Sequence, residues 1–168
     1  LQAGRFTPTG SNLQDVSYYI VQERLDEFKP LVWEGLHSIT PAAARGELAD
    51  TDPTAQTYAA MWQRCYEKYQ QNHDDDVMFF NAPAVLIIAS ELAHHSELVA
   101  SNVELMAYAQ GLGCLYTGFV RRGITYGSQA RQFLGLTGRE NITCMLVGYP
   151  THTYLRTVPR KALQDHWF

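Results

Sequence analysis

Pro8-Thr-Gly-Ser-Asn12, near the start of the chain, is the first of three segments whose residues could bind a ligand. It places Gly10 among the short polar side chains of Thr9, Ser11 and Asn12. Because glycine has no Cβ, backbone N–H groups in such a segment can come close to a flat polar ligand. A solvated turn that leads into a strand has the same composition. The segment therefore has two interpretations, a wall of a ligand site and an ordinary surface turn.

The second segment is Gly111-Leu-Gly-Cys-Leu-Tyr-Thr-Gly118. Its glycines do not fit the GxGxxG pattern of a dinucleotide site, and they follow an expected helix rather than a strand. The segment could present the N–H groups of Thr117 and Gly118 to an acceptor atom. A helix cap followed by a turn explains the same residues equally well.

The third segment is basic and lies near the C-terminus, where Arg156, Arg160 and Lys161 surround Pro159. Guanidinium groups bind phosphate through two hydrogen bonds, and a lysine adds a point charge. The pattern is therefore compatible with a phosphate site, although a solvated basic tail is the ordinary explanation.

Other reactive residues indicate no metal centre and no catalytic side chain. The run Asp74-Asp-Asp76 beside His73 supplies too few converging ligands for a hard metal ion. His94-His95 lacks the HExxH spacing and a third ligand, and it is expected on the surface at the start of a helix. Neither a GxSxG elbow nor a P-loop is present.

The composition favours one domain in a reducing compartment. The chain has 168 residues, 46% of them hydrophobic, which suffices for one core. A net charge of -4 with scattered cations argues against nucleic acid as a partner. Cys65, Cys114 and Cys144 are odd in number and far apart, as is typical of reduced thiols in the cytosol. The longest apolar run, residues 82–89, is too short to cross a membrane, so we expect a cytoplasmic protein.

The spacing of apolar residues predicts the elements that position these segments. Pro30 should divide the helical pattern of residues 23–39 into two short helices, and residues 40–53 should form a loop long enough to be a lid. The other expected elements are strands within 16–21, 79–90 and 142–147, an aromatic helix from 54, a helix over 96–110 and a short one ending at 134. The strand within 79–90 is apolar on both faces, which indicates an α+β or α/β sandwich around one sheet.

Five segments in order resemble the FMN-dependent nitroreductase family over most of the chain. They are PTGSNLQ before a strand, FFNAPAVLIIAS, NVELMAYAQGLGCLYTGF, NITCMLVGYP and TVPRKAL. The resemblance implies an α+β fold with a central, mostly antiparallel sheet wrapped by helices. It also implies an intertwined homodimer with the helix over 96–110 in the interface, and two FMN molecules bound between the subunits.

The same resemblance assigns site residues. Pro8, Thr9 and Gly10 should lie against the isoalloxazine ring across the dimer, with Ser11 and Asn12 supporting the turn. The segment of Tyr116, Thr117 and Gly118 should flank the other side of the flavin. Arg160 should bind the phosphate, assisted by Arg156 or Lys161, from an arm that reaches over the partner.

The sequence lacks one feature that the family normally has before the position of Leu1. Members of the family normally begin with a helix carrying an Arg-Arg-Ser-x-Arg-like sequence that holds the FMN phosphate. We therefore expect residues 1–168 to be a single flavin-binding domain that lacks the usual first helix, about three dozen residues with its connection. Some relatives also carry an iron-sulfur ferredoxin-like domain there. The alternatives are thus an electron-transfer module fed by such a donor, or a noncatalytic flavin-binding relic.

The family mechanism requires no nucleophilic or basic side chain, because the flavin performs the chemistry. NADH or NADPH delivers hydride to flavin N5 and leaves, and a small acceptor is then reduced at the same site in a ping-pong cycle. Nitroaromatic, quinone or enone acceptors are expected. Tyr58, Trp62 and Tyr66, together with the 40–53 loop, are the candidate acceptor pocket because aromatic side chains stack on flat substrates.

Overall fold

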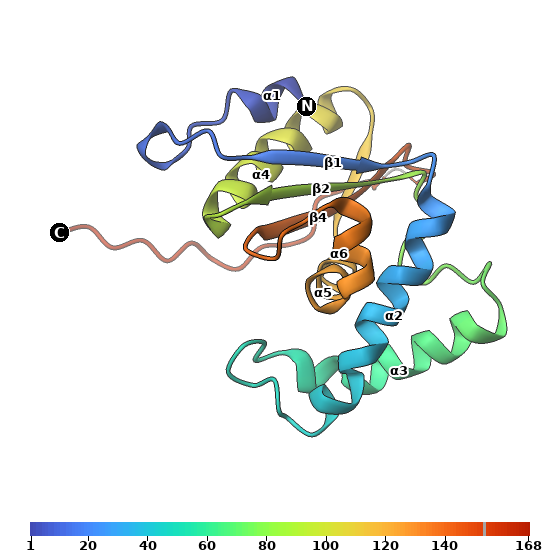
Figure 1. The fold of residues 1–168 in the computed structure, drawn as a ribbon. Helices are drawn as coiled ribbons and strands as arrows, with labels where there is room; N and C mark the ends of the chain where they lie inside the picture. The colour runs from blue at the N-terminus through green and yellow to red at the C-terminus, as the bar shows by residue number, and fades with distance from the viewer. Residues whose placement is uncertain (153) are drawn as a thin grey trace.

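A four-stranded antiparallel sheet in the order β1-β2-β4-β3 forms the centre of the computed structural model, which describes residues 1–152 and 154–168 (Figure 1). The strands are β1 (Ser17–Val21), β2 (Ala84–Ser90), β3 (Gly113–Tyr116) and β4 (Asn141–Gly148). The expected α+β fold with a mostly antiparallel sheet is confirmed, and so are the strands expected at 16–21, 79–90 and 142–147.

Alternate side chains of β2 enter two separate cores, one on each face of the sheet. Val85, Ile87 and Ala89 belong to the larger core, whereas Leu86 and Ile88 point into the smaller one. This is the period-two alternation of a strand that is covered on both faces. The apolar run 82–89 therefore provides most of an inner strand, β2, as its composition predicts.

Two groups of helices cover the two faces (Figure 1). The helix α4 packs on the smaller core and is contacted by α1, whereas α2, α3, α5 and α6 enclose the larger core. The bounds are α1 (Gln2–Arg5), α2 (Leu25–Ala44), α3 (Ala55–Gln71), α4 (Ala93–Ala109), α5 (Gly118–Tyr126) and α6 (Ser128–Leu134), with a 3-10 turn, η1, at Gly10–Asn12. None of the described helices is long and apolar enough to span a bilayer.

The expected break at Pro30 is wrong, because α2 is one continuous helix that contains both Pro30 and Pro41. A proline inside a helix costs about 3 kcal/mol through its missing N–H and its steric clash. The apolar face of α2 offsets that cost, since Phe28, Val32 and Leu36 are almost completely buried. Tertiary packing therefore determines the length of this helix.

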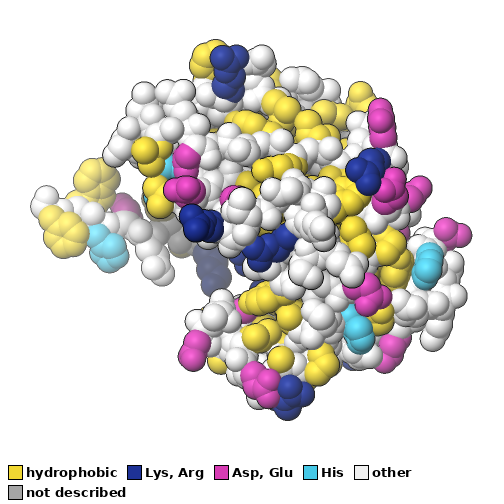
Figure 2. Space-filling model, in the orientation of Figure 1, with side chains coloured by type: hydrophobic (Ala, Val, Ile, Leu, Met, Phe, Trp, Pro, Cys, Tyr) yellow, Lys and Arg dark blue, Asp and Glu magenta, His cyan; other side chains and the backbone are white. Residues whose placement is uncertain are grey.

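Two further expectations need correction. The 40–53 loop is shorter than expected, because α2 continues to Ala44 and only turns remain before α3. The second segment does not form only a helix cap and a turn, because it contains β3 and its last residue, Gly118, begins α5. The C-terminal stretch 154–168 is extended and exposed, and Figure 2 shows hydrophobic side chains gathered at its end, away from the body.

Candidate flavin site

The 8–12 turn, which comprises Pro8, Thr9, Gly10, Ser11 and Asn12, adopts a strained conformation. Ser11 and Asn12 have φ values of 52° and 53°, and Gln14 just beyond the turn has a φ of 52°. Each left-handed residue of this kind costs roughly 1–2 kcal/mol unless its surroundings compensate. Two local hydrogen bonds do so in part. The Gln14 N–H donates to Thr9 Oγ1 at 2.9 Å, and Gln14 Nε2 donates to Asn12 Oδ1 at 3.1 Å.

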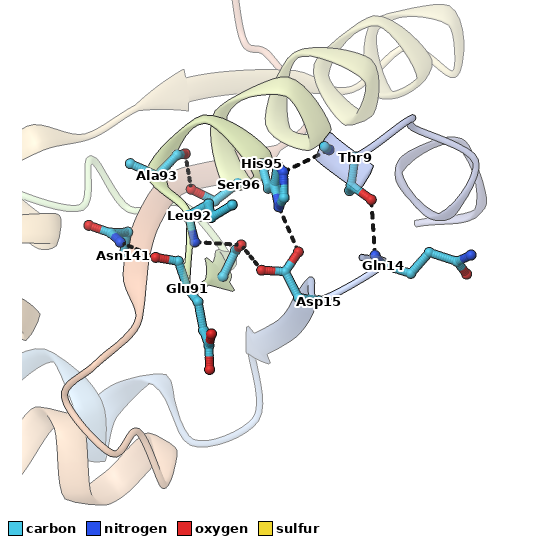
Figure 3. Close-up of polar contacts among 11 residues, drawn as sticks. Thr9, Gln14, Asp15, Glu91, Leu92, Ala93, His95, Ser96 and Asn141 are labelled. Atoms are coloured by element: carbon cyan, nitrogen blue, oxygen red, sulfur yellow. Dashed lines mark hydrogen bonds and ion pairs between the residues drawn. The ribbon is translucent and has the colours of Figure 1, made fainter. Parts of the chain in front are cut away.

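A buried histidine connects this turn to the body of the protein (Figure 3). The Gly10 N–H donates to His95 Nε2 at 2.8 Å, and His95, in the first turn of α4, is 0% exposed. The other ring nitrogen, Nδ1, lies 2.6 Å from Asp15 Oδ1. Because a backbone N–H can only donate, Nε2 must be unprotonated, and the ring proton is therefore on Nδ1 and points at the carboxylate.

Asp15 is in turn held by the end of β2. Its second oxygen accepts a hydrogen bond from Ser90 Oγ at 2.7 Å, and that hydroxyl accepts the Leu92 N–H at 3.2 Å. The Ser90 hydrogen bond, followed by that of His95, lowers the pKa of Asp15 below its ordinary value. Asp15 is therefore a carboxylate at neutral pH, as the ring proton on His95 requires.

The expectation that His94-His95 lies on the surface holds for His94 but is wrong for His95. The sequence did contain a signal for its burial. His95 stands four residues before Val99 and eight before Val103, so it belongs to the apolar stripe of α4. A polar residue on such a stripe needs buried partners, which Asp15 and Gly10 supply here.

Few donors of the turn remain available to a ligand. The Asn12 N–H donates to Thr9 O at 3.0 Å, and the Gly10 N–H is taken by His95. Within residues 1–152 and 154–168, the N–H groups of Thr9 and Ser11 and the Ser11 hydroxyl have no protein partner. These groups, together with Asn12 Nδ2, which donates no hydrogen bond among the described residues, could bind a polar ligand edge.

The second segment forms the junction of β3 and α5. The Thr117 N–H donates to Cys144 O at 3.0 Å, so it is engaged within the chain. Thr117 Oγ1 caps α5 by accepting the Val120 N–H at 3.3 Å. The Gly118 N–H, the first of α5, has no partner among the residues that the structure describes, and it is an amide that this segment can offer.

The surroundings of Gly118 are open on its exposed side. A Cβ at this position would approach only Arg122 Nη1, at 3.2 Å. Tyr116, 43% exposed, lies just before it. Burial, followed by the nearby Glu104, raises the pKa of Tyr116 to about 12, so its hydroxyl is neutral at physiological pH.

The structure does not bring the three segments together within one chain. No hydrogen bond or ion pair joins the 8–12 turn to Tyr116, Thr117 or Gly118 in the described part of the molecule. Arg156, Arg160 and Lys161 are exposed on the extended C-terminal stretch. The assignment of these residues to a flavin site stays a prediction, and their separation fits a site shared between subunits.

Comparison with known proteins identifies the family of the chain. The model of the nitroreductase family matches residues 1–149. The chain belongs to the nitroreductase family. No significant match is found among curated protein sequences.

Solved structures show the same nitroreductase fold. A nitroreductase with bound FMN from Bacteroides fragilis NCTC 9343 has a TM-score of 0.63 at 16% identity, over 96% of this chain and 80% of that one. A nitroreductase with bound FMN from Desulfitobacterium hafniense DCB-2 gives 0.60 at 16%, over 95% and 79%. A variant of the FMN and NADPH-dependent nitroreductase NfnB derived from Sphigopyxis sp. strain HMH gives 0.59 at 16%, over 94% and 82%.

The expected aromatic acceptor pocket is wrong for Trp62. Trp62 is 1% exposed and packs edge-on against Phe119 in the larger core. Tyr66 stacks on His37 at 3.9 Å between ring centroids, and its hydroxyl donates to Glu34 at 2.5 Å. Of the three side chains, only Tyr58 is substantially exposed. The aromatic face of α3 therefore builds the core between α2 and α5.

Proposed function

We propose that the protein is an FMN-dependent oxidoreductase that uses NADH or NADPH to reduce small nitroaromatic, quinone or enone acceptors. The observation that carries this proposal is the 8–12 turn, held in a strained conformation with unpaired donors, in a chain that belongs to the nitroreductase family. Relatives of the same fold are solved with FMN, and one is named for its use of NADPH.

The residues present fit the chemistry of FMN. The flavin ring edge carries acceptor atoms, which suit the N–H groups of Thr9, Ser11 and Gly118. Gly10 and Gly118 have no Cβ to separate these amides from a flat ring. The phosphate is a dianion, for which Arg160 supplies a planar fork of donors and Arg156 or Lys161 further charge.

When bound, FMN would accept hydride from the nicotinamide and pass it to the acceptor in two successive half-reactions. The chain itself orients and shields the reactants. The amides of Thr9, Ser11 and Gly118 fix the plane of the ring, and backbone donors of this kind need no reorganisation during the reaction. We assign no catalytic acid or base to any side chain.

We propose that this site forms between two subunits of a homodimer. The smaller core lies under α4, whose opposite face carries Leu98, Leu105 and Tyr108, which are 51%, 66% and 82% exposed. An apolar face of this size on a surface helix is typical of an interface. A dimer across α4 would allow the 8–12 turn of one subunit to meet the Tyr116 to Gly118 segment of the other.

The test of the proposed function is the visible spectrum of the purified protein and its response to nicotinamide. The protein is expected to be yellow, or to take up added FMN, and to lose its absorbance when NADH or NADPH is added without oxygen. A protein that takes up no FMN contradicts the proposal. A yellow protein that neither nucleotide bleaches, but that a ferredoxin-like donor reduces, is the expected outcome for an electron-transfer module.

Replacing Arg160 by alanine tests the phosphate assignment. We expect FMN to bind about tenfold to a hundredfold more weakly, because a charge-assisted hydrogen bond contributes about 1.5–3 kcal/mol. Titration of the apoprotein with FMN, followed by quenching of flavin fluorescence, measures this change. The Arg139→Ala variant, which removes an exposed cation from a loop, is the matched control. Equal affinities of the two variants would exclude Arg160 from the site.

Replacing Leu105 by glutamate tests the dimer. We expect the protein to become monomeric and to lose FMN, because a charge at the centre of an apolar interface is desolvated without a partner. Sedimentation or light scattering measures the mass of the particle. Phe80→Glu places the same charge at another exposed apolar residue, 65% exposed, and should leave the dimer intact. A Leu105→Glu protein that remains a dimer contradicts the proposed interface.

A cytoplasmic location, and a single flavin-binding domain over residues 1–168, stay predictions.

A further inference from the structure

We propose that His95 is the positioning residue that holds the 8–12 turn in its flavin-binding conformation, and that a second proton on its ring releases the turn. This inference rests on the proposed function. It concerns a residue that lies outside the three segments proposed to contact the cofactor. His95 is completely buried, so it acts through the backbone of Gly10.

The bond from Gly10 to His95 is the anchor of the turn. Among the described residues it is the one hydrogen bond that joins residues 8–12 to another secondary-structure element, because the remaining bonds lie within the segment from Thr9 to Gln14. The contact is also sterically close. A Cβ at Gly10 would lie 3.0 Å from His95 Nε2, so this approach favours glycine.

Strain in the turn gives this anchor its importance. Ser11 and Asn12 are left-handed, a conformation that non-glycine residues leave when nothing compensates. The first of them carries the Ser11 N–H, one of the two backbone amides of the turn that are available to a ligand. Loss of the anchor would therefore misplace the donors that we assign to the flavin, while the sheet and α4 remain folded.

The anchor depends on which ring atom carries the proton. Asp15 accepts the Nδ1 proton, so the Nε2 lone pair faces Gly10. Of the titratable groups described, Asp15 and the neighbouring His94 face the ring, the latter edge-on at 4.4 Å between centroids. The turn contributes none, and Ser90 from the end of β2 contributes a neutral hydroxyl.

A proton from solvent that bonds to the Nε2 lone pair makes His95 an imidazolium. Both ring nitrogens are then donors, and Nε2–H opposes the Gly10 N–H instead of accepting from it. The carboxylate of Asp15 still accepts the Nδ1–H. Protonation of His95 is therefore expected to release the turn, and with it the cofactor.

Two variants separate the roles of the two ring nitrogens of His95. In His95→Gln the side-chain carbonyl can reach the place of Nε2 and accept from Gly10, but the amide does not meet Asp15. In His95→Asn the amide can replace Nδ1 and donate to Asp15, but nothing replaces Nε2. We expect His95→Asn to accelerate exchange of the Gly10 amide about tenfold in the apoprotein, and to weaken FMN binding by a similar factor.

His95→Gln should stay closer to the original protein in both measurements. Equal effects of the two variants on Gly10 exchange, or no effect of His95→Asn, would overturn the proposal. Far-ultraviolet circular dichroism shows whether each variant is folded.

The pH dependence of the unsubstituted protein is a second measurement that needs no variant. Exchange of the Gly10 amide, corrected for its intrinsic rate, should rise along the same curve as protonation of His95 followed by nitrogen chemical shifts. Protection that persists after the ring is fully protonated contradicts the proposal. The exchange of the Gly10 amide, in the variants and as a function of pH, is measured in the apoprotein. It therefore tests His95 even if FMN does not bind, an outcome that would contradict the proposed function alone.

Discussion

Replacement of Asp52 by alanine is expected to lower the free energy of unfolding by about 3–5 kcal/mol, the usual cost of removing one partner from a buried ion pair. Both oxygens of Asp52 accept from the Arg122 guanidinium, through Nε and, at 2.8 Å, through Nη2. Arg122 Nη2 also donates to Thr54 Oγ1 at 2.7 Å. Asp52 and Arg122 are 8% and 9% exposed, so the variant leaves a buried cation without its counter-ion.

Urea denaturation at neutral pH measures this loss. Asp50→Ala is the matched control, because Asp50 lies in the same connection but is exposed. Its effect should stay within about 0.5 kcal/mol. Asp52 and Asp50 variants of equal stability would contradict the assignment of the ion pair as a structural contact.

The ion pair has consequences for the site as well as for stability. It connects the turns between α2 and α3 to α5, and Arg122 also lies over the ring of Trp62, 5.3 Å from its centroid. The first residue of α5 is Gly118, whose amide we assign to the flavin. The connection expected to be a lid is therefore fastened to the helix that offers that amide.

The same pair predicts how stability depends on pH. Hydrogen bonding to Arg122 lowers the pKa of Asp52 from 3.8 to about 2 in the folded protein. A depressed folded-state pKa gives a contribution that is complete above pH 3.8 and is lost as the pH falls toward about 2. The difference in stability between the original protein and Asp52→Ala should therefore shrink over this interval. A difference that stays constant down to pH 2 contradicts the shift.

Local patterns in the sequence predict the elements whose structure is determined locally. The strands β1, β2 and β4 are rich in β-branched residues, with two tyrosines in β1, and such runs favour a strand in any sheet. The helix α2 is different, since its continuity through Pro30 depends on contacts with α3 and α5 that lie far away in the sequence. Propensity alone cannot reveal such compensation.

In the candidate site, too, some features follow from local sequence and others from contacts between distant residues. Resemblance to the family predicts that the 8–12 turn and the Tyr116 to Gly118 segment belong to the site, because short motifs in a fixed order remain visible in a sequence. The anchor between Gly10 and His95 joins residues 85 positions apart, so no local pattern predicts it. Trp62 was misassigned for a related reason, because an aromatic stripe looks the same whether it lines a pocket or fills a core.

Replacement of Gly35 by alanine is expected to destabilise the protein by about 1–3 kcal/mol or more, as overpacking of a tight contact does. Gly35 on α2 faces Gly123 on α5, and a Cβ at Gly35 would lie 2.1 Å from the Gly123 carbonyl oxygen. It would also lie 2.8 Å from Gly127 Cα. Backbone atoms cannot rotate away as a flexible side chain can, so the two helices would have to separate.

Two opposing effects decide the sign of this result. Alanine stabilises a helix by about 1 kcal/mol relative to glycine, so an uncrowded position would gain stability. Gly113→Ala, in β3, controls for the added Cβ in an uncrowded place but not for helix propensity, because the new Cβ would meet nothing closer than Pro150 Cβ at 3.6 Å. Thermal unfolding of the two variants compares them. If Gly35→Ala is as stable as the original protein, α2 and α5 do not approach this closely.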